Sequence, residues 1–303
     1  YKSDDSRIKH VGYINLPVLN LAIREYRLTR EVLRWYRKNK GDYVHYIFVY
    51  SMHSAFLKVA ALIKRKNVNT KIILFVPDLP LFMSKTLSIK RIFKYLDWMR
   101  IRLFMKYIDF YALYTGRMAG YLGLKGNNWM VFEGAYDFSR VSSRSQKREN
   151  NCRICLYVGN LSHYNNISGL IDAFNLLAVK NVELHFVGDG EAVKTIKEAA
   201  KSNHRIKYLG IASQQEAFEL MQSVDLLINP RPSTEEFTYY SFPSKIIDYM
   251  ASGTPVVSTR LPGIPEEYFQ HLYVFEDEST IGMSEKLNKR GNFKMVSEEM
   301  ILA

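Results

Sequence analysis

Three polar residues, Ser244, Lys245 and Asp248, are spaced so that one helix would bring their side chains together. A hydroxyl and an ammonium in the first turn of a helix favour a bound diphosphate, because backbone N–H groups of that turn also point at the ligand. Asp248 lies one turn beyond Ser244 on the same face, where a carboxylate accepts hydrogen bonds from ribose hydroxyls. The spacing therefore predicts a nucleotide-sugar site.

The flanking residues predict a helix over residues 242–252. Ser241 is a suitable N-cap, Pro243 fits the first turn, and Gly253 followed by Pro255 would end the helix. The predicted helix therefore begins just ahead of the residues that would bind the diphosphate.

Two glycine-containing loops follow predicted buried strands. Gly159 and Asn160 come directly after a strand predicted over 153–158, and Gly210 follows one predicted over 206–209. Backbone N–H groups in the Gly159 loop would contact a phosphate. Gly159 alone is a weak signal, since many loops between a strand and a helix contain glycine for their geometry only.

The loop over residues 230–240 places charged residues between a predicted strand and the predicted helix. It contains Arg231 and two carboxylates, Glu235 and Glu236. A merely solvated loop is the plain alternative. Its place beside the predicted diphosphate site favours a functional loop.

Asp78 is the strongest candidate in the first half of the chain. It follows a strand predicted over 71–76 and stands between Pro77 and Pro80. Prolines fix the backbone, which suits a carboxylate that must be held in place, although a turn-forming aspartate is equally compatible with this pattern. His53 follows another strand and ranks below Asp78, because a lone histidine is more often a polar contact than a catalyst.

The net charge of +12 is unevenly distributed along the 303 residues. Residues 1–150 hold 28 Lys and Arg against 11 Asp and Glu, whereas residues 151–303 hold 14 against 19. The first half therefore predicts an anionic partner. We find no helix-turn-helix, zinc-finger or RNA-binding signature, so a nucleic acid is not expected.

A helix predicted over 88–108 combines apolar and basic residues. The apolar ones are Ile89, Ile92, Phe93, Leu96, Met99 and Leu103, and the basic ones are Lys90, Arg91, Lys94, Arg100, Arg102 and Lys106. Such a helix fits an anionic membrane surface. It fits equally a helix that covers its own domain and exposes a basic face. The basic charge of this half favours the membrane.

Strands and helices alternate along both halves. In the first, helices are predicted over 17–39, 54–66 and 88–108, and strands over 46–50, 71–76 and 110–114. In the second, strands are predicted over 153–158, 182–187, 206–209, 225–229 and 255–258, and helices over 166–178, 191–201, 214–222 and 242–252. This alternation predicts parallel sheets, which bind ligands beyond the C-terminal ends of their strands.

These residues resemble those of a known family, the retaining GT-B-fold glycosyltransferases of family 4-like, bacterial capsule and exopolysaccharide type. The resemblance rests on Tyr157–Gly159, Phe186–Gly190, Val224–Ile228, Phe242–Val257 and Leu261–Tyr268 in the second half. In the first half it rests on Val76–Pro80 and Phe132–Gly134.

The resemblance implies an α/β protein of two Rossmann-like domains. Residues 1–140 would form an acceptor-binding domain that is incomplete, residues 141–151 a linker, and residues 152–303 the nucleotide-sugar domain. The implied reaction transfers a sugar from a UDP- or GDP-sugar to a saccharide or lipid-linked acceptor with retention. It would serve polysaccharide biosynthesis in the cytoplasm, at the inner face of the plasma membrane.

The resemblance also implies residue roles. Ser244, Lys245 and the Gly159–Asn160 loop would hold the diphosphate, Asp248 the ribose, and residues 206–211, including Gly210, would line the base. Asp78, Lys245 and Glu236 would be catalytic. No metal is expected, and the missing D-x-D motif agrees with that.

Two departures from the family pattern keep other functions open. The first of two family glutamates falls on Tyr240, unless Glu235 or Glu236 replaces it, and two family cations fall on Asn160 and Asn165, which leaves Lys245 as the main cation. A catalytically weak or inactive partner subunit is therefore an alternative. A basic nucleic-acid-binding protein is favoured by charge alone.

Overall fold

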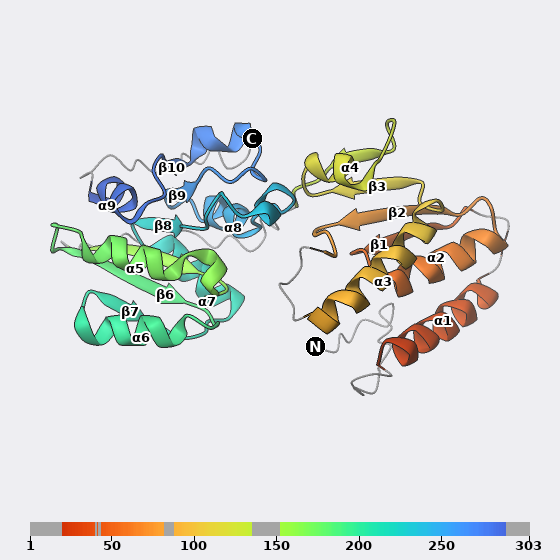
Figure 1. Ribbon diagram of the computed structural model, residues 1–303, viewed down its shortest axis with the longest axis horizontal. Coiled ribbons are helices and arrows are strands. Elements are labelled where there is room, and N and C mark those ends of the chain that lie inside the picture. Colours follow the sequence, from red (N-terminus) through yellow and green to blue (C-terminus); the bar gives the residue numbers. More distant parts are fainter. Residues whose placement is uncertain (1–19, 40, 42–43, 82–87, 135–151, 289–303) are drawn as a thin grey trace. The chain divides into compact units, whose positions relative to one another are not determined.

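The computed structural model describes residues 20–39, 41, 44–81, 88–134 and 152–288 (Figure 1). The chain divides into two compact units, unit 1 (Tyr1–Phe132) and unit 2 (Glu133–Ala303). The predicted linker over 141–151 lies outside the described residues, so its bounds stay a prediction.

Unit 1 contains a parallel sheet in the order β1-β2-β3-β4. Its strands are β1 (Tyr46–Tyr50), β2 (Lys71–Val76), β3 (Phe110–Leu113) and β4 (Trp129–Val131), and its described helices are α1 (Asn20–Lys38), α2 (Ser54–Lys66), α3 (Ser88–Met105) and α4 (Arg117–Leu122). Alternate residues of β2, namely Ile72, Leu74 and Val76, are fully buried. Helix α2 contacts β1 and β2, and both α1 and α3 pack against α2 (Figure 1).

Unit 2 contains a parallel sheet in the order β10-β9-β8-β5-β6-β7. Its strands are β5 (Arg153–Val158), β6 (Val182–Val187), β7 (Ile206–Tyr208), β8 (Leu226–Asn229), β9 (Val256–Thr259) and β10 (Tyr273–Phe275). Its described helices are α5 (Ile167–Asn175), α6 (Val193–Ser202), α7 (Gln214–Ser223), α8 (Lys245–Ala251) and α9 (Thr280–Asn288).

The strand order of unit 2 makes a topological switch point. Strands β5, β6 and β7 follow one another toward one edge, and β8, β9 and β10 follow one another toward the other. The chain reverses between the neighbouring strands β5 and β8, and this is where a doubly wound sheet leaves a crevice for a ligand.

The sheet of unit 2 is buried on both faces. Leu226 and Ile228 of β8 belong to one apolar cluster, whereas Leu227 between them belongs to another on the opposite face. All four residues of β8 are buried. Apolar runs without polar alternation are what such strands require, and they made these strands predictable.

The predicted α/β class, with two Rossmann-like parallel sheets, is confirmed. Every strand predicted from the sequence forms, with bounds shifted by a residue or so at some ends. Within the described ranges, two α-helices and two strands were not predicted, namely α4, α9, β4 and β10, and neither were the short 3-10 helices of unit 2. The predicted bounds of the helix over 242–252 are wrong, because α8 begins only at Lys245.

Candidate functional site

The candidate site of unit 2 lies at the switch point. Gly159 follows β5 directly, Arg231 lies two residues after β8, and Lys245 opens α8. A methyl group built on Gly159 would lie 3.5 Å from Lys245 Nζ, so the ammonium lies against the Gly159 loop. The sequence predicted that Gly159 and Lys245 share one edge of the sheet, and the structure brings them together.

Lys245 extends over a buried tyrosine. Its ammonium donates a 2.6 Å hydrogen bond to the Tyr157 hydroxyl and lies 4.1 Å from the centre of the Tyr157 ring. Burial of the ammonium, with a smaller contribution from the positive charge of Arg231, holds the pKa of Lys245 well below its usual range. A negatively charged group beside Lys245 would therefore stabilise the charged form of its side chain.

A chain of hydrogen bonds joins the two cations. The Tyr157 hydroxyl donates to the Asn160 carbonyl at 2.7 Å, and Asn165 Nδ2 donates to the same carbonyl at 2.8 Å. Arg231 Nε then donates to Asn165 Oδ1 at 3.0 Å. Burial raises the pKa of Tyr157, so its hydroxyl keeps the proton that this chain uses. The network fixes the loop after β5 between Lys245 and Arg231.

The sequence analysis named Arg231 in the loop over 230–240 and Asn165 at a family cation position, but it gave neither residue a role in the site. The resemblance left Lys245 as the main cation, but Arg231 supplies a second positive charge close enough to lower the lysine pKa. Asn165 is 3% exposed and stands where the family has a cation, and here it orients Arg231 instead. The position of Arg231 just after β8 was the available signal.

The neighbouring loops require glycine. Gly159 and Gly188 have φ of 134° and 135°, and a methyl group on Gly188 would come within 1.9 Å of the Gly159 carbonyl oxygen. The Gly188 N–H donates to the Gly210 carbonyl at 2.9 Å, which ties the third loop to the first two. The loops after β5, β6 and β7 thus form one hydrogen-bonded edge.

The Gly210 loop is the open part of this edge. A methyl group on Gly210 would meet no atom within 4 Å. Its neighbours Leu209 and Ile211 are exposed, at 45% and 74%. This surface has the apolar character needed to stack on a base, and the base-lining role expected for residues 206–211 stays a prediction.

The start of α8 differs from the prediction. Ser244, rather than Ser241, is the N-cap residue, and its side chain makes no capping hydrogen bond. Phe242 and Pro243 are buried, and the Phe242 ring packs against the Tyr268 ring with 5.5 Å between the ring centres. This packing holds the segment out of the helix. The exposed Ser244 hydroxyl remains a candidate ligand contact.

Tyr249 anchors α8 to the end of β5. Its hydroxyl accepts a hydrogen bond from the Val158 N–H and donates one to the Val158 carbonyl, both at 2.9 Å. Tyr249 is fully buried. These bonds hold Lys245, one turn earlier on the same helix, in position over Tyr157.

The remaining predicted residues are placed less tightly. Asp248 is half-buried on α8, and Glu236 is exposed at the start of the 3-10 helix η3 (Glu236–Tyr239). Asp78 lies in unit 1, exposed, two residues after β2, and its charge contributes to raising the pKa of Tyr114 after burial and the neighbouring Tyr50 hydroxyl. Their roles stay predictions.

The described residues form no group of three or more His, Cys, Asp or Glu side chains that could hold a metal ion. The prediction of a metal-independent reaction is not tested by this finding and stays a prediction.

Comparison with known proteins places the second unit beside a known family. Residues 152–289 match the family described as Glycosyl transferases group 1. N-acetyl-alpha-D-glucosaminyl L-malate synthase from Bacillus anthracis is 29% identical over 141 residues, which is 44% of this chain. The alignment spans only 35% of that relative's length.

Two solved structures have a similar fold over most of the chain. Anabaena HepE, crystallised with UDP and glucose, is similar with a TM-score of 0.62 at 15% identity, over 91% of this chain and 74% of that chain. WaaG, a glycosyltransferase of lipopolysaccharide biosynthesis, gives 0.59 at 15% identity, over 93% and 76%. At such identity the likeness shows the fold alone. Together the comparisons show a fold shared with glycosyltransferases, with unit 2 similar to the group 1 glycosyl transferases.

Proposed function

We propose that the chain transfers a sugar from a nucleotide-sugar donor, a UDP- or GDP-sugar, to a saccharide or lipid-linked acceptor. The observation that supports this most is the network at the switch point, in which Lys245 and Arg231 are joined through Tyr157, Asn160 and Asn165. Two cations and a glycine loop at the C-terminal ends of parallel strands are suited to a diphosphate.

The costly event in such a transfer is departure of the nucleoside diphosphate. Positive charges fixed beforehand stabilise the negative charge that develops on the leaving group, without reorganising during the reaction. Lys245 and Arg231 fulfil this requirement because packing and hydrogen bonds already hold them in place. The Asn160 N–H group and the Ser244 hydroxyl would complete the diphosphate site, whereas the Gly159 N–H already donates to the Val187 carbonyl.

The other residues take roles that the resemblance implies. Asp248 would bind the ribose, the Gly210 loop the base, and Glu236 the transferred sugar. Asp78 would contact the acceptor from unit 1. We propose retention of the anomeric configuration and no metal requirement.

We further place the reaction in polysaccharide biosynthesis, of the capsule or exopolysaccharide kind, in the cytoplasm at the inner membrane face. WaaG acts in lipopolysaccharide biosynthesis, and unit 1 is rich in Lys and Arg. No helix within the described ranges has both the length and the apolar composition to cross a bilayer. Attachment would then be peripheral, through the surface of unit 1.

The direct test is an assay of the full-length protein with a panel of UDP- and GDP-sugars and saccharide or lipid-linked acceptors. We expect one donor to be consumed with formation of a glycoside of unchanged anomeric configuration. Transfer with inversion would contradict the proposed stereochemistry.

A second candidate, a partner subunit that binds nucleotide without transferring sugar, is favoured by Tyr240 at the position of a family glutamate. It predicts saturable UDP or GDP binding together with no transfer to any acceptor. Absence of nucleotide binding would contradict both candidates.

A further inference from the structure

One side of α3 exposes a row of apolar residues. We call its four residues the α3 stripe: Ile92, Leu96, Met99 and Leu103, exposed at 61%, 50%, 51% and 67%. Their spacing places them on one side of the helix, whereas the buried residues Trp98 and Ile101 lie on the other. The helix thus covers its own domain through Trp98 and Ile101, as the alternative interpretation expects, and leaves the stripe exposed on the opposite side.

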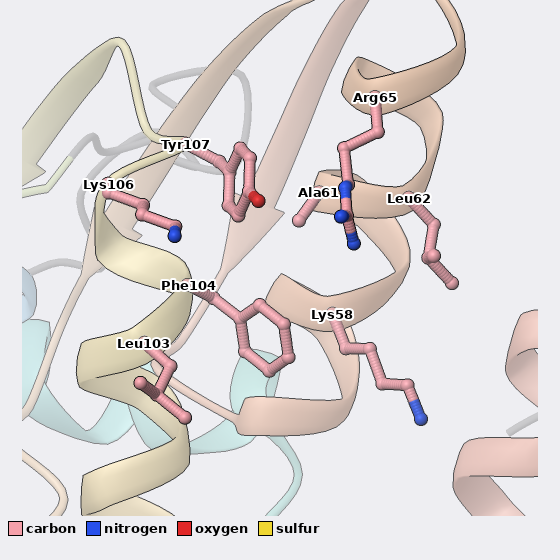
Figure 2. A pocket seen from close by; sticks show the side chains of 8 residues that line it. All are labelled: Lys58, Ala61, Leu62, Arg65, Leu103, Phe104, Lys106 and Tyr107. Atoms are coloured by element: carbon pink, nitrogen blue, oxygen red, sulfur yellow. The ribbon is translucent and has the colours of Figure 1, made fainter.

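A pocket lies beside the end of this stripe, between α2 and the C-terminal end of α3 (Figure 2). Its volume is about 300 Å³. It is lined by Lys58, Ala61, Leu62, Arg65, Leu103, Phe104, Lys106 and Tyr107. The Phe104 and Tyr107 rings point toward α2, from which the Arg65 guanidinium extends alongside them (Figure 2).

The pocket has three cationic side chains and no acidic one. Lys58 is ion-paired with Glu25 of α1. For Arg65 and Lys106, which are exposed, the described part of the chain provides no acidic partner within ion-pair distance. An anionic group in the pocket would therefore meet at least two positive charges that no carboxylate neutralises.

We propose that this pocket binds the phosphate of an anionic phospholipid while the α3 stripe inserts at the membrane surface. Leu103 belongs to both features, so headgroup and acyl chain would meet the protein side by side. The proposal deepens, and rests on, the membrane part of the proposed function. Nucleic acid would use the positive charges but would leave the aliphatic stripe exposed to water.

The pocket is separate from the predicted acceptor residue. It lies at the C-terminal ends of α2 and α3, which lead into the N-terminal ends of β2 and β3. Asp78 follows the C-terminal end of β2, at the opposite edge of the sheet. Changes in the pocket should therefore leave acceptor binding intact.

The test is flotation of the full-length protein with phosphatidylcholine vesicles that contain or lack phosphatidylglycerol, at about 0.1 M salt, where the Debye length is about 10 Å. We expect binding only with phosphatidylglycerol. Arg65→Glu and Lys106→Glu should each lower the partition coefficient at least about tenfold, since a charge reversal removes one attraction and adds one repulsion. The matched control Lys125→Glu, in the exposed loop between α4 and β4 and outside the pocket, should change it much less.

Two further variants test the α3 stripe. Met99→Gln and Leu103→Gln should each weaken binding to the same vesicles without changing the thermal unfolding midpoint, because both side chains are exposed. An equal loss of vesicle binding in Lys125→Glu and Arg65→Glu would overturn the proposal that the pocket binds the lipid phosphate. Binding to single-stranded RNA with no vesicle binding would overturn the lipid proposal in favour of nucleic acid.

Nucleotide binding separates this proposal from the donor site. Affinity for UDP or GDP should be the same in Arg65→Glu, Lys106→Glu and the unmodified protein. If a pocket variant loses vesicle binding but keeps its affinity for UDP or GDP, the change affects the lipid site of unit 1 and leaves the donor site of unit 2 intact.

Discussion

At the residue scale, the site depends on two cations that share one network. The Arg231 and Lys245 side chains come from different loops, and Asn165 and Tyr157 fix their positions from β5 and the loop after it. Such an arrangement is fixed before the ligand arrives, which reduces the cost of ordering two long side chains on binding.

We expect Lys245→Met and Arg231→Gln each to weaken UDP or GDP binding by about 1.5–3 kcal/mol, the range for hydrogen bonds to charged groups, or roughly ten- to a hundredfold. The double variant should lose less than the sum, because both cations hold the same diphosphate. Calorimetry on the four proteins measures this coupling. Lys201→Met, an exposed cation on α6, is the matched control and should bind as the unmodified protein does.

The lowered pKa of Lys245 predicts proton uptake on binding. Phosphate charges beside the ammonium raise its pKa, so between the free and bound pKa values binding takes up a proton, and affinity falls as pH rises through that window. Calorimetry in buffers of different ionisation enthalpy measures the uptake. An unchanged uptake in Lys245→Met would show that another group titrates.

The lowered pKa of Lys245 also makes the stability of the protein depend on pH. Because the pKa of Lys245 is lower in the folded than in the unfolded protein, the unfolded state binds more protons between the two values. The free energy of unfolding should therefore rise with pH across that range, and Lys245→Met should lack this contribution.

At the element scale, the loops after β5, β6 and β7 form one unit because a glycine allows close approach. Gly188→Ala would bring a methyl group within 1.9 Å of the Gly159 carbonyl oxygen, in a backbone with φ of 135°. Gly210→Ala shares the positive φ but meets open space.

We expect Gly210→Ala to cost about 1 kcal/mol of unfolding free energy from backbone strain, and Gly188→Ala at least about 2 kcal/mol more, because neighbouring backbone must move. Denaturant unfolding measures both. Equal losses would mean that the close approach to Gly159 does not constrain the loops. Gly188→Ala should also weaken nucleotide binding, since it displaces the Gly159 loop.

Much of this architecture was predictable, and particular residues show where prediction stopped. Strands such as β6 and β8 are short and mostly apolar, with Glu183, His185 and Asn229 as their polar residues, so composition and length identified them. The strands β4 and β10 have three residues each, too few to show periodicity. Helix α8 was predicted to begin too early because buried packing of Phe242 overrode good capping chemistry at Ser241.

Part of the site was predictable because the ends of the strands can be located in the sequence. These strand ends brought Gly159 and Lys245 to one edge. The Arg231–Asn165 hydrogen bond joins residues 66 positions apart, and the exposure of the α3 stripe depends on which face packs inward. Neither follows from local spacing.

At the scale of the whole molecule, the two units have different surfaces. Unit 1 carries the basic pocket and the α3 stripe, and unit 2 carries the paired cations at its switch point. The proposed donor site of unit 2 and the proposed lipid-binding surface of unit 1 agree with transfer to an acceptor at a bilayer. Each can be tested without the other.

The claim that unit 2 holds the diphosphate of a nucleotide sugar is tested most directly by comparing nucleoside diphosphates with monophosphates. Calorimetry on the full-length protein should show UDP or GDP binding at least about tenfold tighter than the matching monophosphate, as one added charge-assisted contact provides. Lys245→Met together with Arg231→Gln should abolish that difference. Equal affinity of the unmodified protein for diphosphate and monophosphate would contradict the account.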